Sequence, residues 1–162
     1  SHEALLLPYE EGMTRCDADP PSYNLGAHFL WLGYRTALPD SAHVDYLRGI
    51  SNPLGIKVGP KMKISDLLEI LHILDPQSIP GKITLITRFG ADQVDRYLPA
   101  VIEAVERDKH PVIWSCDPMH GNTVMTHEGR KTRKLESIFS ELEQTFATAA
   151  TTFRPCKSGS RL

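Results

Sequence analysis

An apolar run at residues 111–114 is followed at once by a polar loop that contains Asp117, His120 and Asn122. Side chains of these types can accept a proton, donate one or bind a metal ion. A buried strand that runs into such a loop is typical of the catalytic edge of an α/β enzyme. Two simpler interpretations stay open: His120 as a hydrogen-bonded structural histidine, and Asp117 as the organiser of the turn at Pro118.

A cation or an imidazole follows each of four successive predicted strands. These residues are Arg35, Lys57, Arg88 and His120. In parallel α/β folds, ligands bind at the carboxyl ends of the strands. Three cations at one edge repel one another unless an anion lies between them, and phosphate and carboxylate groups suit Arg and Lys. The pattern predicts a site for a small, multiply anionic metabolite, although a single strand-end cation is more often a solvated or ion-paired surface group.

The other candidate motifs give weaker evidence for a function. Cys116 and His120 could suggest a zinc site or a thiol nucleophile, but no second Cys or His stands at ligand spacing. Residues 55–60 match neither the dinucleotide fingerprint nor a Walker loop, so nucleotide binding is not expected. The remaining histidines are scattered over predicted strands, helices and loops, and no chemistry is assigned to them: His2, His28, His43, His72, His110 and His127.

Short apolar segments without strict alternation predict the strands that position these residues, as expected for parallel strands buried on both faces. The predicted strands are residues 4–8, 27–33, 54–58, 83–87 and 112–116. Residues 9–25, which are polar and contain two prolines, predict a long irregular connection between the first two strands.

Helical spacing of apolar residues marks the segments between and after these strands. Three stripes lie within residues 64–74, 94–105 and 135–146, and a shorter helix is predicted over residues 41–48. Ser65 is the predicted N-cap of the first stripe. Alternating strands and helices indicate an α/β fold with a parallel sheet and right-handed crossovers.

Two architectures fit five strands of this kind. One is an open, doubly wound sheet, and the other is part of a TIM-type (β/α)8 barrel. A complete barrel has eight strands and about 250 residues, so the chain taken alone favours the open sheet. Taken as a piece of a longer protein, it favours the barrel.

Composition narrows the class of protein. The chain has 162 residues, of which 41% are hydrophobic, enough for one globular domain with its own core. A formal net charge of −2 provides no basic field for nucleic acid. No apolar run approaches the roughly 20 residues of a membrane span, and the opening residues lack the pattern of a signal peptide. Three widely spaced cysteines predict reduced thiols in a cytosolic compartment: Cys16, Cys116 and Cys156.

Several motifs, in unbroken order from Ser1 to about Phe146, resemble the class II (plant-type) 3-deoxy-D-arabino-heptulosonate-7-phosphate synthases. The motifs are SHEALLL at residues 1–7, AHVDYLRGI at 42–50, NPLGIKVGP at 52–60, DPMHGNT at 117–123 and KTR at 131–133. They are long enough that chance is a poor explanation for the match.

The resemblance implies a (β/α)8 barrel enzyme of the shikimate pathway. Members of this family condense phosphoenolpyruvate with erythrose 4-phosphate, release phosphate, and depend on a divalent metal such as Mn²⁺ or Co²⁺. Carried over by position, Arg35, Lys57, Arg88 and the main chain of Tyr34 match the residues that hold phosphoenolpyruvate. Lys57, Arg88 and His120 are then the catalytic residues, and His120 matches the metal-ligand histidine.

The family pattern is only partly present. Its other metal ligands are a Cys on the first strand, a Glu on the eighth strand and an Asp in the loop that follows, and none has a counterpart here. Tyr34 stands where the family usually has Glu, a change that a main-chain contact would survive. The basic residues that the second strand contributes to the substrate pocket are also absent. The chain therefore corresponds to strands three to seven of the barrel, and it is expected to be inactive by itself.

The domain prediction is an incomplete barrel over residues 1–150 and a divergent, disordered tail over residues 151–162. The implied compartment is the cytoplasm, or the plastid if the source is a plant. A homo-oligomer is conceivable for the full-length parent. Two rival functions stay open: a truncated, non-catalytic protein that binds an anion or pairs with a partner, and a metal-assisted phosphatase that uses Asp117 and His120.

Overall fold

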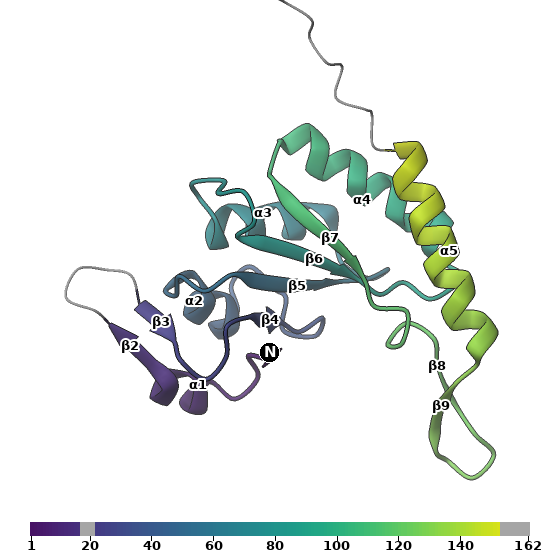
Figure 1. The fold of residues 1–162 in the computed structure, drawn as a ribbon, viewed down its shortest axis with the longest axis horizontal. Helices are drawn as coiled ribbons and strands as arrows, with labels where there is room; N and C mark the ends of the chain where they lie inside the picture. The colour runs from purple at the N-terminus through teal and green to yellow at the C-terminus, as the bar shows by residue number, and fades with distance from the viewer. Residues whose placement is uncertain (17–21, 153–162) are drawn as a thin grey trace, which may run out of the picture.

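A five-stranded parallel sheet runs through the computed structural model, which describes residues 1–16 and 22–152 (Figure 1). Its strands are β1 (His2–Glu3), β4 (Leu30–Leu32), β5 (Leu54–Val58), β6 (Ile83–Thr87) and β7 (Val112–Cys116). They lie side by side in chain order, and every pair of neighbours is parallel. The predicted α/β fold with a parallel sheet is confirmed.

Helices cover one face of this sheet. They are α2 (Ala42–Arg48), α3 (Ile64–Leu74), α4 (Val94–Asp108) and α5 (Leu135–Thr152), and α5 packs against α4 beside the β7 edge (Figure 1). The strand side chains that face the helices are fully buried: Leu30, Leu32, Leu54, Ile56, Ile83 and Leu85. Doubly wound sheets carry helices on both faces. Sequential strand order with helices on one face instead agrees with an arc of a TIM-type barrel.

The alternate residues of the strands project from the other face of the sheet, which is only partly covered. Trp31, Lys57 and Ile86 are half-buried there, and Ser115 is exposed. The ammonium of Lys57 lies 5.6 Å from the centre of the Trp31 ring, a cation–π contact. In a barrel arc this face is the one that turns toward the barrel axis.

The N-terminal region differs from its prediction. The predicted strand at residues 4–8 is wrong, because β1 ends at Glu3 and helix α1 (Leu7–Met13) begins within that range. Pro8 lies in the first turn of α1, where its fixed φ and missing N–H favour a helix start. The buried Glu10 carboxylate joins α1 to its surroundings by accepting a hydrogen bond from Asn24 Nδ2 at 2.8 Å.

The predicted irregular connection over residues 9–25 is therefore partly wrong. Besides most of α1 it contains β2 (Thr14–Cys16) and β3 (Ser22–Asn24), which form a two-stranded antiparallel sheet. The predicted strand at residues 27–33 is confirmed with narrower bounds, as β4. The strands predicted at residues 54–58, 83–87 and 112–116 are confirmed with the same bounds.

The predicted helices are confirmed with two adjustments. Ser41 caps α2, and its hydroxyl accepts a hydrogen bond from the Val44 N–H at 3.2 Å. For α3 the predicted cap is wrong: Lys63 holds the N-cap position, and Ser65 lies inside the helix with its hydroxyl donating to Asp66 Oδ1. Ser65 cannot cap because the helical backbone already includes it.

Two further features complete the described chain. A hairpin of β8 (Thr123–Met125) and β9 (Lys131–Arg133), which the sequence pattern did not indicate, follows the β7 loop. Helix α5 continues to Thr152, two residues into the predicted tail, and residues 153–162 of that tail lie outside the described residues. Within the described ranges no helix combines the length and the apolarity that crossing a membrane requires.

Candidate functional site

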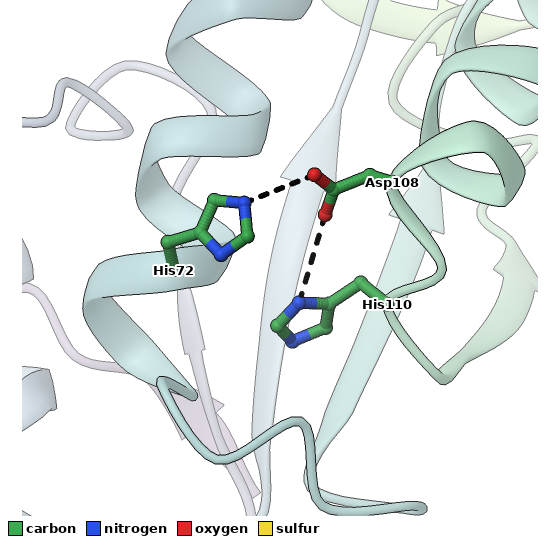
Figure 2. A group of neighbouring side chains, drawn as sticks. All are labelled: His72, Asp108 and His110. Carbon is green, nitrogen blue, oxygen red and sulfur yellow. Dashed lines mark hydrogen bonds and ion pairs between the residues drawn. The ribbon is translucent and has the colours of Figure 1, made fainter.

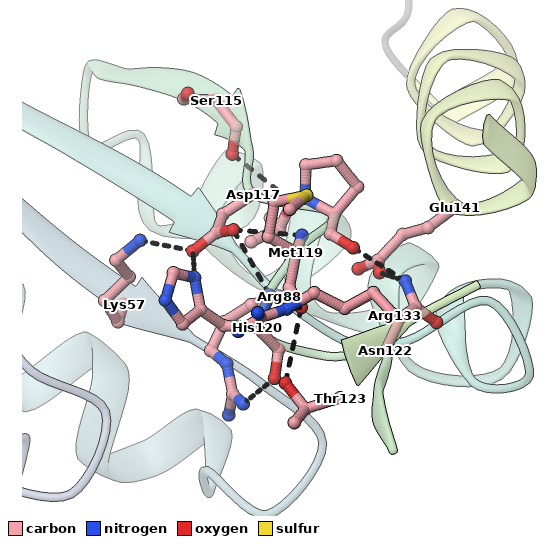
Figure 3. A network of polar contacts seen from close by, with 12 residues as sticks. Lys57, Arg88, Ser115, Asp117, Met119, His120, Asn122, Thr123, Arg133 and Glu141 are labelled. Carbon is pink, nitrogen blue, oxygen red and sulfur yellow. Dashed lines mark hydrogen bonds and ion pairs between the residues drawn. The ribbon is translucent and has the colours of Figure 1, made fainter. Parts of the chain in front are cut away.

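The site at the carboxyl edge of the sheet is built around Asp117, which follows β7 directly. Its Oδ2 atom lies 2.5 Å from Nζ of Lys57, at the end of β5, and 2.6 Å from Nδ1 of His120 (Figure 3). Parallel pairing places β5 and β7 on either side of β6, so their carboxyl ends open onto the same edge. One carboxylate thus joins two of the predicted site residues.

The charge on Asp117 is maintained by these neighbours. Burial alone would raise the pKa of the Asp117 carboxyl, but the hydrogen bond and the charge of Lys57, with a further contribution from His120, hold that pKa below its ordinary value. An ionised carboxylate can only accept hydrogen bonds, so His120 must donate from Nδ1. In the neutral ring, the lone pair of His120 then lies on Nε2.

The other oxygen of Asp117 has a structural role. Its Oδ1 atom accepts hydrogen bonds from the backbone N–H groups of Met119, at 3.1 Å, and His120, at 3.4 Å. This Asx-type turn after Pro118 is the simpler interpretation of Asp117 considered from the sequence. One oxygen of Asp117 thus organises the turn, and the other pairs with Lys57 and His120.

Arg88, which follows β6, lies beside this group. Its Nη2 atom donates to the carbonyl oxygen of His120 at 2.5 Å (Figure 3). Its guanidinium lies 4.6 Å from the centre of the Tyr34 ring. The Tyr34 hydroxyl in turn accepts a hydrogen bond from the Lys61 N–H at 2.7 Å. Stacking on an aromatic ring fixes the plane of an arginine while leaving further N–H donors for a ligand.

The structure brings together most of the residues predicted from the sequence. Lys57, Arg88, His120 and Tyr34 belong to one connected group through the contacts described above. Arg35 is exposed on the loop after β4, where it lines a surface hollow together with Lys61 and Lys63. The predicted repulsion among three cations is reduced, because Asp117 already balances the charge of Lys57.

Asn122 holds the β7 loop in place. Its Oδ1 atom accepts a hydrogen bond from the Ala91 N–H at 3.0 Å, and its Nδ2 atom donates to Glu141 Oε2 on α5 at 2.6 Å (Figure 3). The same amide donates to the carbonyl of Pro118 at 2.8 Å. One side chain therefore connects the loops after β6 and β7 with α5.

Glu141 is the buried anchor of this arrangement. Its carboxylate is fully buried and accepts hydrogen bonds from the Phe89 N–H, at 2.8 Å, and from Asn122. Burial raises the pKa of the Glu141 carboxyl, and the hydrogen bonds from Gly90, Phe89 and Asn122 offset only part of that rise. Glu141 was not predicted as a site residue, because in the sequence it is one of several polar residues of an amphipathic helix.

Two glycines allow the same loops to touch. Gly90 has a φ of 90°, which side-chain-bearing residues rarely adopt, and its backbone lies against that of Gly121. A Cβ atom on Gly121 would lie under 3.0 Å from the backbone of Gly90 and Phe89. Gly121 and Asn122 of the DPMHGNT motif thus hold the two loops together. This packing role was not predicted from their position beside His120 in the sequence.

Cys116 lies on the opposite face of β7 from this site. Its thiol is within 3.6 Å of the Thr145 hydroxyl on α5, and it lines a cavity of about 360 Å³ with Trp114 and Leu142. Burial is the main cause that raises the pKa of the Cys116 thiol, which disfavours the nucleophilic thiolate. This geometry agrees with the rejection of Cys116 as a nucleophile or a zinc ligand.

Two places in the described residues have donors for a metal ion. At the first, His120 is 62% exposed, and its Nε2 atom has no hydrogen-bond partner within residues 1–16 and 22–152. His120 can therefore supply one ligand to a metal ion. A carboxylate on the far nitrogen of a histidine is the usual support for such a ligand. At the second, His72, Asp108 and His110 form a group far from this edge, at the amino end of β7.

Comparisons with known proteins agree with this geometry. A model of the class-II DAHP synthetase family matches residues 1–156. A phospho-2-dehydro-3-deoxyheptonate aldolase of Neurospora crassa is 52% identical, over 90% of this chain and 34% of that protein. A probable chloroplastic phospho-2-dehydro-3-deoxyheptonate aldolase of Catharanthus roseus is 48% identical, over 88% of this chain and 29% of that protein. The chain thus spans about a third of the length of these relatives, and it belongs to the class-II DAHP synthetase family.

Proposed function

We propose that this chain carries part of the active site of a 3-deoxy-7-phosphoheptulonate synthase. This enzyme condenses phosphoenolpyruvate with erythrose 4-phosphate and water, and it releases phosphate in the first step of aromatic amino-acid biosynthesis. The observation that carries the proposal is the contact chain from Lys57 through Asp117 to His120, next to Arg88, at the carboxyl edge of a parallel sheet. The reaction named for the two relatives supports it.

The cations are assigned to phosphoenolpyruvate, with Lys57 and Arg88 as the catalytic cations. Arg88 makes a cation–π contact with Tyr34, and its guanidinium suits a bidentate contact to a carboxylate or phosphate. Lys57 donates one of its three N–H groups to Asp117, and the other two can donate to the substrate. Arg35 and the main chain of Tyr34 would bind the same substrate from the loop after β4. Fixed cations of this kind orient the phosphoenol group and stabilise negative charge that develops during the reaction.

His120 is assigned to a divalent metal, with Mn²⁺ or Co²⁺ as the expected ion. When bound, the ion would act as a Lewis acid that polarises the aldehyde carbonyl of erythrose 4-phosphate. Asp117 holds the His120 ring through Nδ1, which leaves Nε2 as the nitrogen that would bind the ion. The remaining ligands and the basic residues of the second strand would come from outside this chain.

The sheet is proposed to be an arc of a closed (β/α)8 barrel in a longer protein, with the barrel part extending to the end of α5 at Thr152. Closure would cover the exposed face around Ser115 and Trp31, and it would remove the free strand edges. The compartment is proposed to be the cytoplasm, or the plastid in a plant.

Steady-state kinetics of the longer protein test the proposal. His120→Ala is expected to abolish metal-dependent condensation, and Arg88→Ala is expected to raise the KM for phosphoenolpyruvate roughly tenfold or more, because it removes a charge-assisted contact. The 162-residue chain with Mn²⁺ is expected to show negligible turnover. Unchanged metal dependence in His120→Ala would refute the ligand assignment. Phosphoenolpyruvate binding without any condensation by the longer protein would favour a non-catalytic anion-binding role.

A further inference from the structure

Three side chains that are distant in the sequence meet at the amino end of β7. His72 lies near the end of α3, Asp108 is the last residue of α4, and His110 lies between α4 and β7 (Figure 2). One ligand atom from each lies within 4.8 Å of the other two. His120 follows the carboxyl end of β7, so this group lies at the other end of the sheet from the proposed active site.

Two atoms in this group are buried without a hydrogen-bond partner in the part of the chain that the structure describes. They are Nδ1 of His110 and Oδ2 of Asp108. The His110 side chain is fully buried, and leaving such groups unpaired costs free energy. The two atoms are 3.9 Å apart, too far for a hydrogen bond. Two ligands at about 2.1 Å from a tetrahedral ion lie about 3.4 Å apart, so a small adjustment would let both bind one ion.

The surroundings of His110 favour this arrangement over an ordinary ion pair. Its Nε2 atom lies 3.2 Å from Oδ2 of the buried Asp75, which also accepts a hydrogen bond from the Ile79 N–H. With an ion bound, the Nε2–H of His110 would donate to Asp75, and Nδ1 would face the ion beside Asp108. A carboxylate behind a histidine is the usual second partner of a metal-bound imidazole.

His72 supplies the open side of the group. Its Nε2 atom lies 3.0 Å from Asp108 Oδ1, and its side chain is 58% exposed. An ion can therefore reach the group from solvent, and a water molecule can occupy a fourth position. Two imidazoles and one carboxylate are the ligand types of Zn²⁺, whereas Mg²⁺ and Ca²⁺ prefer sites made only of oxygen atoms.

We propose that His72, Asp108 and His110 form a structural zinc site that ties α3 to the junction of α4 and β7. The ion would bind one atom of each side chain, and its contacts with Nδ1 of His110 and Oδ2 of Asp108 would satisfy the two unpaired buried atoms. None of these residues belongs to the proposed active site, so this inference does not depend on the proposed function.

Calorimetric titration of the metal-free 162-residue chain with Zn²⁺ tests the proposal. The chain carries Cys16→Ser, which removes an exposed thiol that could compete for zinc. We expect one zinc ion per chain and a higher Tm with zinc. His72→Gln is expected to weaken binding at least tenfold. Because His72 is mostly exposed, this substitution should leave the far-UV circular dichroism unchanged.

Two matched substitutions locate the ion. His127→Gln, at an exposed loop histidine, and His120→Gln, in the proposed active site, should both bind zinc as tightly as the parent chain. Co²⁺ in place of zinc should give the visible absorption of a four-coordinate ion without a thiolate charge-transfer band. Absent zinc binding, full affinity in His72→Gln, loss of affinity in His120→Gln, or a thiolate band would each overturn the proposal.

Discussion

Oδ2 of Asp117 lies 2.6 Å from Nδ1 of His120 and 2.5 Å from Nζ of Lys57. The first contact selects the ring tautomer that keeps Nε2 unprotonated, and the second keeps the carboxylate charged. Asp117 thus connects the cation at the end of β5 with the imidazole after β7. Asp117 therefore contacts both the cation proposed to bind phosphoenolpyruvate and the imidazole proposed to bind the metal ion.

We expect Asp117→Asn to weaken metal binding in the longer protein by about 10- to 100-fold, the usual effect of losing a carboxylate behind a ligand histidine. The amide is neutral, and its NH₂ group cannot accept from His120 or Lys57. Titration with Mn²⁺ measures the effect. Asp92→Asn, at an exposed position in the neighbouring loop, is the matched control and should bind Mn²⁺ normally. Equal affinity in both variants would show that Asp117 does not support the ligand.

The same substitution should change how the stability of the chain depends on pH. The pKa of the Asp117 carboxyl in the folded chain is below its ordinary value of 3.8, so its ionised form stabilises the fold above that pH. This contribution is lost as the pH falls through the folded-state pKa. Urea unfolding measures this between about pH 2.5 and pH 7, the range in which carboxyl groups titrate. The free energy of unfolding should decrease less on acidification for Asp117→Asn than for the parent chain. An identical slope in both would contradict the low pKa.

Sequence periodicity was sufficient for the part of the fold that carries the site. Residues 54–58, 83–87 and 112–116 are apolar runs bounded by turn residues, and each forms the predicted strand. The strand prediction for residues 4–8 was wrong because apolar content alone does not distinguish a strand from the start of a helix. There Pro8 and the buried Glu10 decide the outcome through local backbone geometry and a tertiary hydrogen bond.

The sequence predicted only those site residues that directly follow a strand. Lys57, Arg88 and His120 follow that rule, and parallel pairing brings them to one edge. Glu141 and the group around His110 depend on contacts between elements far apart in the chain, and periodicity contains no information on such contacts. The helix that bears Glu141 was predicted, but not which of its polar residues turns inward.

Gly121→Ala should destabilise the chain by about 1 to 3 kcal/mol, the typical range for overpacking. The new Cβ atom would lie under 3.0 Å from the backbone of Gly90 and Phe89, which cannot move without disturbing Glu141. Chemical denaturation measures the loss. Gly12→Ala is the control, because a Cβ atom there meets nothing within 4 Å, and it should leave the stability unchanged or slightly higher. Equal stability of the two variants would show that the loops are not held in contact.

Glu141→Gln should destabilise the chain by about 1 to 3 kcal/mol at neutral pH, the cost of an unsatisfied buried polar group. One end of the new amide can still accept from the Phe89 N–H, but its NH₂ group then faces the NH₂ group of Asn122. Turning Asn122 over would instead break its bond with the Ala91 N–H. Glu143→Gln, on the exposed face of the same helix, is the matched control and should have little effect.

The pH dependence of the stability of Glu141→Gln provides a second test of the role of Glu141. The raised pKa of the Glu141 carboxyl means that the folded chain favours its protonated form, so this group stabilises the fold most at low pH. That contribution decreases as the pH rises through the folded-state pKa, opposite in sign to Asp117. The stability of Glu141→Gln should therefore rise more steeply with pH than that of the parent chain from about pH 4.3, the ordinary glutamate value, upward. Parallel stability curves for the two chains would show that Glu141 ionises normally despite its burial.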